Sequence, residues 1–109
     1  IKSIYENLEA IIKICQQNNA LVLLAGMQLP PNYGITYTKK FQAIFPQLAE
    51  DYPIKLIPFL LAGFGDKQEF FQADGIHPNE IAQKEIVENV WKILQTMFKK
   101  EQVAVNLNN

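Results

Sequence analysis

The spacing of apolar side chains along the chain predicts three helices separated by two short apolar runs. Residues 3–18 repeat apolar positions at helical intervals, with charged and amide side chains between them. Residues 35–51 have the same period, although Pro46 within them predicts a kink or a break. Residues 79–99 carry the longest apolar stripe, and we expect residues 101–109 to form a flexible tail beyond it.

The two apolar runs between these helices predict strands. Residues 20–26, ALVLLAG, show no alternation, which is typical of a strand covered on both faces in a parallel sheet. Residues 54–59, IKLIPF, predict a second strand, in which Pro58 shortens the regular part or marks a sheet edge. The order predicts an α/β fold with one right-handed parallel crossover. Because the first run needs two neighbours and the chain supplies at most one, the pattern predicts half of a three-layer α/β domain.

Each predicted strand is followed by a loop. The first loop, MQLPPNYG, is rich in proline and asparagine, and the second, residues 60–78, includes a short helix around residues 67–71. In open α/β sheets, ligands bind at the carboxyl ends of the strands, where these loops begin. The second loop contains His77, the only histidine of the chain, so we expect it on the functional edge of the sheet.

Composition narrows the classes of function. Of the 109 residues, 49% are hydrophobic and 19% are charged, which is typical of a globular protein. Ten basic and eleven acidic side chains give a net charge of -1, so nothing indicates a nucleic-acid partner. The apolar runs are too short to cross a bilayer. The single cysteine, Cys15, excludes an intrachain disulfide and is expected in the core.

The segment ADGIHPNE carries the candidate chemistry. Asp74 and His77 stand three residues apart, and Gly75 between them permits a tight turn. In such a turn Asp74 accepts a hydrogen bond from one ring nitrogen of His77, which leaves the other nitrogen free to act as a base. This is the orienting half of a Ser-His-Asp triad. Pro78 favours an extended His77 and is expected to begin the next helix.

The same segment is also typical of a polar turn that opens a helix. Aspartate and asparagine are common in turns, and Asn79 is a good helix cap whatever His77 does. A metal site is less favoured still, because the chain has one histidine and one cysteine. Both interpretations of the segment remain open at this point.

A triad also requires a nucleophile, and no residue of the chain has the right context. Ser3 is the only serine and stands at a helix start, where a capping role is expected. Three threonines, Thr36, Thr38 and Thr96, lack the strand-to-helix elbow that exposes a catalytic hydroxyl. Cys15 falls on the apolar face of a predicted helix.

Three segments together resemble the SGNH (GDSL-type) hydrolases. They are the loop and helix LPPNYGITYTKKFQAIFPQLA, the strand IKLIPF and the block DGIHPNEIAQ. The resemblance is greatest to the branch of acyl-CoA thioesterase I, lysophospholipase L1 and the arylesterases, and it extends over residues 1–97. It implies a three-layer, flavodoxin-like α/β/α fold with parallel strands, in which residues 1–100 form the C-terminal half of a single domain. It also implies hydrolysis of a small-molecule acyl ester or thioester by a serine enzyme that uses no cofactor.

The resemblance also assigns roles to residues. It implies that His77 is the general base and Asp74 its orienting partner, and that Leu29, Pro30 and Tyr33 contact the substrate. An equally open interpretation is that these three residues only shape their loop. The Gly-Asp-Ser block, the oxyanion glycine and the Gly-x-Asn-Asp block of the family are absent. We therefore expect the nucleophile in a missing N-terminal half of the same domain, and the chain alone to be inactive.

Some alternatives stay open. The chain begins IKSIYENLEA, without an initiator methionine or signal peptide, so we expect it to be part of a longer protein. A periplasmic or secreted location is suggested by the resemblance alone. The main alternative to an enzyme is a non-catalytic α/β module, either a degenerate hydrolase or a domain that completes its sheet with a partner. A carbohydrate deacetylase of the same family would have a more polar loop than MQLPPNYG.

Overall fold

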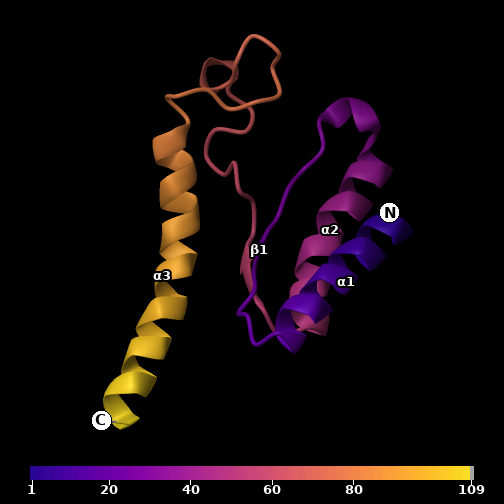
Figure 1. Cartoon of the computed structure of the whole chain (residues 1–109). Coiled ribbons are helices and arrows are strands. Elements are labelled where there is room, and N and C mark those ends of the chain that lie inside the picture. The colour runs from indigo at the N-terminus through magenta and orange to yellow at the C-terminus, as the bar shows by residue number, and fades with distance from the viewer. Residues whose placement is uncertain (109) are drawn as a thin grey trace. The chain divides into compact units, whose positions relative to one another are not determined.

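A computed structural model describes residues 1–108 of the chain, with side chains described through residue 98. The chain is divided into two compact units, Ile1–Phe59 and Leu60–Asn109. Figure 1 follows the elements from the N-terminus to the C-terminus. Their order is α1 (Lys2–Gln17), β1 (Leu23–Ala25), the 3₁₀ helix η1 (Pro31–Tyr33), α2 (Ile35–Asp51), β2 (Lys55–Ile57), the 3₁₀ helix η2 (Gln68–Phe70) and α3 (Gln83–Asn108).

The two strands are parallel neighbours joined through α2, as the sequence predicts. Leu23 pairs with Lys55 and Ala25 pairs with Ile57. One further bond extends the ladder, because the Gly26 N–H donates to the Ile57 carbonyl at 2.8 Å. A Cβ atom on Gly26 would lie 2.3 Å from the Pro58 carbonyl oxygen, so only glycine allows this close approach. The expected α/β class with parallel strands is confirmed.

Both strands are shorter than the apolar runs that predict them. Each contains three residues, whereas the runs cover residues 20–26 and 54–59. The second strand, β2, ends before Pro58, which has no N–H to donate. All three residues of β1 are half-buried, although the run predicts cover on both faces. Within the described residues β1 pairs with β2 alone.

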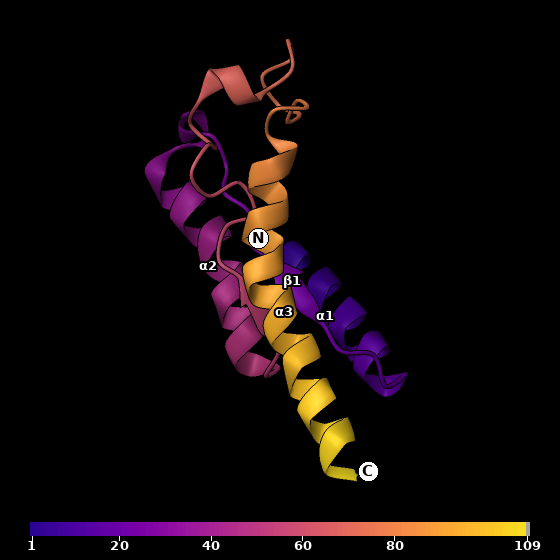
Figure 2. The same cartoon turned by 90° about the vertical axis from the view of Figure 1, so that its left-hand side faces the viewer.

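The core of the first unit lies between its helices and its strands. Ile12 of α1 meets three buried residues of α2: Ile44, Phe45 and Leu48. Partly buried side chains of both strands, Leu24 and Leu56 among them, pack against this cluster. Figures 1 and 2 show α1 and α2 side by side along the strands. Much of each helical stripe read from the sequence is therefore packed in this unit. Ile11 of the first stripe and Tyr37 of the second are exceptions, because both are exposed.

The two ends of α1 differ from each other in how they are capped. Asn18 donates from Nδ2 to the Ile14 carbonyl at 2.8 Å, and Asn19 adopts the left-handed conformation at φ 60°. These two asparagines end the helix. At the other end the N-cap is Ile1, and no side chain caps the helix. The prediction that Ser3 is a cap is wrong, because the helix begins one residue earlier, at Lys2.

Polar contacts link α1 to the end of α2. The Tyr5 hydroxyl donates to Asp51, and this hydrogen bond raises the pKa of Tyr5 to about 12. The Tyr52 hydroxyl donates to Glu9, which likewise raises the pKa of Tyr52. Cys15, which was expected in the core, is only half-buried.

α2 has the predicted bounds and continues through Pro46 as a single element, so of the expected kink or break the break does not occur. α3 differs more from its predicted bounds. α3 begins at Gln83 rather than at residue 79, because residues 79–82 form a separate turn. It also continues to Asn108 instead of ending at residue 99, since no glycine or proline follows Lys100. Asn109, the last residue of the expected tail, lies outside the described residues.

The second unit has its own aromatic contacts. Phe64 is 1% exposed, and its ring centroid lies 5.4 Å from that of Phe70 and 6.0 Å from that of Phe71. Asn89 of α3 donates to the carbonyls of Leu60 and Ala62, each at 3.0 Å. These contacts give the long loop a fixed base. Over the described residues, none of the helices combines the length and the apolarity that a membrane span requires.

Candidate active site

The turn from Gln72 to His77 is organised around one carboxylate. Oδ1 of Asp74 accepts hydrogen bonds from the backbone N–H groups of Ile76, at 2.9 Å, and of His77, at 3.0 Å. Gly75 adopts φ 69°, a left-handed conformation that other residues rarely reach. The Gly75 N–H donates to the Gln72 carbonyl at 2.9 Å and closes the turn. Asp74 and Gly75 therefore specify this local geometry from the sequence itself.

The second oxygen of the same carboxylate faces the histidine ring. Nδ1 of His77 lies 2.6 Å from Oδ2 of Asp74. An ionised carboxylate only accepts hydrogen bonds, so Nδ1 carries the proton in this pair. In the neutral ring Nε2 is then the unprotonated nitrogen, which is the state of a general base. The hydrogen bond expected from the Asp-x-x-His spacing is present.

The electrostatics of the turn favour an ionised Asp74. Its pKa falls from an ordinary 3.8 to about 2. The hydrogen bond to the His77 side chain is the largest cause, followed by the hydrogen bonds from the N–H groups of Ile76 and His77. The side chains of His77 and Asp74 are 70% and 40% exposed, so the pair lies at the surface of the described chain. A partner or a substrate can reach it there.

An isolated antiparallel β-bridge and two flanking hydrogen bonds hold the backbone of His77 in place. Phe71 forms a β-bridge with Pro78, and the Gln72 N–H donates to the His77 carbonyl at 2.8 Å. The Asn79 N–H donates to the Phe70 carbonyl, also at 2.8 Å. Pro78 lies in this bridge and does not begin α3, so the prediction that it starts the next helix is wrong. The histidine is held by the bridge rather than by a helix.

The expected substrate residues lie in the loop after β1. Leu29 is half-buried, Pro30 is exposed, and Tyr33 is exposed at the end of η1. The Tyr33 N–H donates to the Pro30 carbonyl at 3.2 Å, and its ring stacks on Tyr37 with centroids 6.4 Å apart. The structure brings these three residues together in one loop of the first unit. Asp74 and His77 come together in the second unit.

The hydroxyl groups near helices do not supply a nucleophile. Thr38 and Thr96 donate to the carbonyls of Ile35 and Ile93, at 3.0 and 2.6 Å, as threonines within helices often do. Ser3 is exposed in the first turn of α1, and Cys15 is half-buried in the same helix. No described residue of the second unit places a serine or cysteine beside His77, since that unit contains neither residue type.

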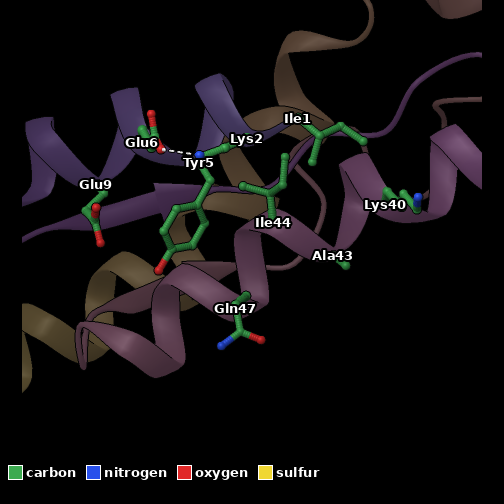
Figure 3. A pocket seen from close by; sticks show the side chains of 9 residues that line it. All are labelled: Ile1, Lys2, Tyr5, Glu6, Glu9, Lys40, Ala43, Ile44 and Gln47. Atoms are coloured by element: carbon green, nitrogen blue, oxygen red, sulfur yellow. Dashed lines mark ion pairs between the residues drawn. The ribbon is translucent and has the colours of Figure 1, made fainter.

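A separate open groove lies between α1 and α2. Figure 3 shows the side chains that line it, among them Tyr5, Glu6, Lys40 and Gln47. Neither Asp74 nor His77 lines this groove. Lys2 and Glu6, which do line it, form an exposed ion pair at 3.9 Å across one turn of α1.

Within the described part of the chain, no three acidic, histidine or cysteine side chains gather closely enough to hold a metal ion.

Comparison with known proteins identifies relatives of the chain, although no family model matches it. It is 41% identical to the esterase TesA of Pseudomonas aeruginosa over 93 residues, which are 85% of this chain and 46% of that protein. It is 38% identical over 92 residues to thioesterase 1/protease 1/lysophospholipase L1 of Escherichia coli, covering 84% of this chain and 44% of that protein. An arylesterase of Vibrio mimicus is also 38% identical, with 82% and 44% covered.

Solved structures agree with these relatives. A crystal structure of TesA matches with a TM-score of 0.83 and 40% identity, over 87% of this chain and 53% of that one. The esterase EstA of Pseudoalteromonas matches with a TM-score of 0.82 and 33% identity, over 90% and 54%. AlinE4, an SGNH-hydrolase family esterase, matches with a TM-score of 0.64 and 33% identity, over 88% and 51%.

These matches confirm the resemblance to the SGNH hydrolases, and the chain spans about half the length of the curated relatives it matches.

The contacts of the Asn79 side chain are a feature of the candidate site that the sequence does not predict. The sequence predicts only a capping role for Asn79, but its side chain also donates to the carbonyls of Glu69 and Phe71. The signal available in the sequence was the position of this amide, two residues after the candidate base His77.

Proposed function

Because the chain is homologous to SGNH-hydrolase esterases over about half of their length, we propose that it supplies the acid–histidine half of a serine ester hydrolase. The observation that carries this proposal is the hydrogen bond of 2.6 Å between Nδ1 of His77 and Oδ2 of Asp74. This bond orients the ring and leaves Nε2 as the base, which is the arrangement that a serine nucleophile requires.

The reaction follows from that arrangement. A serine supplied by the rest of the domain attacks the carbonyl carbon of the ester while Nε2 of His77 takes the hydroxyl proton. Asp74 stabilises the imidazolium that forms. Backbone and side-chain donors, also supplied by the rest of the domain, stabilise the tetrahedral oxyanion. His77 then protonates the leaving group and afterwards activates water to release the acid.

The first unit has the surface that such a completing half requires. β1 has one described strand partner, and its other edge offers unpaired backbone groups. Three apolar side chains on α1 or just before β1 are each more than half exposed: Ile11, Ile14 and Leu21. Exposed apolar groups of this kind are typical of an interface. The remaining half of an SGNH-type domain is the partner that we propose for this edge.

The substrate class follows from the relatives' names and from the loop after β1. The relatives are an esterase, a thioesterase that is also called a lysophospholipase, and an arylesterase. Leu29, Pro30 and Tyr33 offer apolar surface and one aromatic ring. We propose that these side chains contact the acyl group of a small ester or thioester.

A chimera with a known relative tests the proposal. In it, this chain replaces the 93 aligned residues of the Pseudomonas aeruginosa esterase TesA, and p-nitrophenyl acyl esters are the substrates. We expect turnover from the chimera and none from the isolated chain. His77→Ala in the chimera should lower kcat by about 10²- to 10⁴-fold, because the general base is lost. Ser3→Ala should leave kcat unchanged.

Circular dichroism and gel filtration establish that each chimera is folded before its activity is interpreted. A folded chimera that shows no turnover contradicts the proposal and favours a non-catalytic module. A chimera whose His77→Ala variant keeps most of its rate removes His77 from the mechanism. Turnover by the isolated chain that survives removal of every hydroxyl candidate would contradict the serine scheme.

A further inference from the structure

From its contacts with the loop, we infer that Asn79 is a positioning residue, which fixes the His77 ring against Asp74 by tying two carbonyls of the preceding loop to the start of α3. This inference rests on the proposed function for its consequence in catalysis. Its structural content, the orientation of His77, is testable without any activity.

The side chain of Asn79 makes contacts in two directions. Its Nδ2 donates to the Glu69 carbonyl at 2.8 Å and to the Phe71 carbonyl at 3.2 Å. Its Oδ1 accepts from the N–H groups of Ile81, at 3.0 Å, and Ala82, at 3.3 Å. One half of the amide therefore holds the loop, and the other half caps the turn that leads into α3.

The carbonyls that Asn79 holds belong to Glu69 of η2 and to Phe71, the residue that follows η2. Phe71 pairs with Pro78, and the Gln72 N–H donates to the His77 carbonyl at 2.8 Å. Phe71 also packs on the buried Phe64 ring, with centroids 6.0 Å apart. The backbone of His77 is thus connected through Phe71 to the aromatic base of the unit, and Asn79 closes this connection.

The exposed ring of His77 has little packing of its own to hold it. Its side chain is 70% exposed, and its described polar contact is the hydrogen bond to Asp74. The ring position therefore depends on the backbone at both ends of the turn. Small displacements of a catalytic group are costly, since a shift of about 1 Å lowers a rate by about 10²-fold.

Asn79→Asp separates the two functions of the amide. An aspartate keeps an oxygen for the N–H groups of Ile81 and Ala82, but its second oxygen repels the carbonyls of Glu69 and Phe71. Asn89→Asp is the matched control. Asn89 also donates from Nδ2 to two carbonyls, those of Leu60 and Ala62, which lie outside the turn.

The single histidine allows a direct measurement on this chain. Nitrogen-15 labelling of histidine, observed at a pH where the ring is neutral, reports which ring nitrogen carries the proton. The unmodified chain should have the proton on Nδ1, held there by Asp74. We expect Asn79→Asp to shift the proton toward Nε2, as in free histidine, and Asn89→Asp to leave it on Nδ1. In the TesA chimera, Asn79→Asp should lower kcat about 10²-fold with little change in KM.

A folded Asn79→Asp chain that keeps the proton on Nδ1 to the same extent as the unmodified chain overturns the inference. If that variant does not fold, Asn79→Ser, which retains a shorter capping oxygen, takes its place. If neither folds, Asn79 acts through overall stability and the inference is wrong. An inactive chimera alongside the expected Nδ1 signals contradicts the proposed function and leaves the positioning role standing. Protonation on Nε2 in the unmodified chain contradicts the Asp74–His77 pair itself.

Discussion

The helical core of the first unit and the Asp74–His77 turn of the second unit hold their side chains by opposite means. Leu48 is 0% exposed and is surrounded by apolar side chains of two helices. Asp74 and His77 are exposed and are positioned by directional hydrogen bonds. Apolar packing is not directional. Hydrogen bonds, in contrast, specify both the distance and the direction between two groups. The difference teaches that a stable core and a prepared site are separable in this chain.

The largest expected effect is on the core. Leu48→Ala should lower the free energy of unfolding by about 2–5 kcal/mol, since it removes apolar contacts and leaves a cavity. Urea unfolding followed by circular dichroism measures this loss. Ile14→Ala, on the exposed face of α1, is the control and should change the stability of the isolated chain by less than about 0.5 kcal/mol. Equal losses for the two variants would mean that Leu48 is not the packing centre.

Asp74→Asn reverses the pattern, because it should affect activity far more than stability. Asparagine keeps an oxygen for the N–H groups of Ile76 and His77 but loses the charge that faces Nδ1. In the TesA chimera we expect kcat to fall by about 10²-fold or more. The midpoint of thermal unfolding should change little, because Asp74 lies at the surface and buries no apolar area. A loss of stability large enough to explain the loss of rate would make Asp74 a structural residue.

The pH dependence of the turn gives a smaller but more specific effect. The pKa of Asp74 is lowered from 3.8 to about 2, so its contribution to stability is complete above about pH 4 and is lost as pH falls through 2. The amide signals of Ile76 and His77 in nuclear magnetic resonance should therefore titrate with a midpoint near 2. In Asp74→Asn this titration should disappear. A midpoint near 4 would mean that the hydrogen bonds to the carboxylate do not persist in solution.

The smallest expected effect is that of Ser3→Ala. Ser3 is exposed and does not cap α1, so the free energy of unfolding should change by less than about 0.5 kcal/mol. Thermal unfolding of the two chains side by side measures the difference. A larger loss would show that the hydroxyl makes a contact absent from the described structure.

Much of the fold could be predicted because its signals are local. The period of apolar residues predicted both ends of α1 and of α2 to within one residue. The two apolar runs predicted the positions of both strands. Other boundaries depended on partners distant in the sequence. β1 is limited to three residues by its ladder with β2, and α3 begins at Gln83 because Asn79 caps a separate turn first. Pro46 does not break α2, because the helix contributes the buried neighbours Ile44, Phe45 and Leu48.

By itself, the sequence determined the Asp-x-x-His turn. Asp74, Gly75 and His77 lie within four residues, so short-range hydrogen bonds and the freedom of glycine suffice to pair the carboxylate with the ring. Only the tertiary structure decided what holds that turn. The bridge from Phe71 to Pro78 and the contacts of Asn79 with Glu69 join residues up to ten positions apart, and no local propensity specifies such pairs.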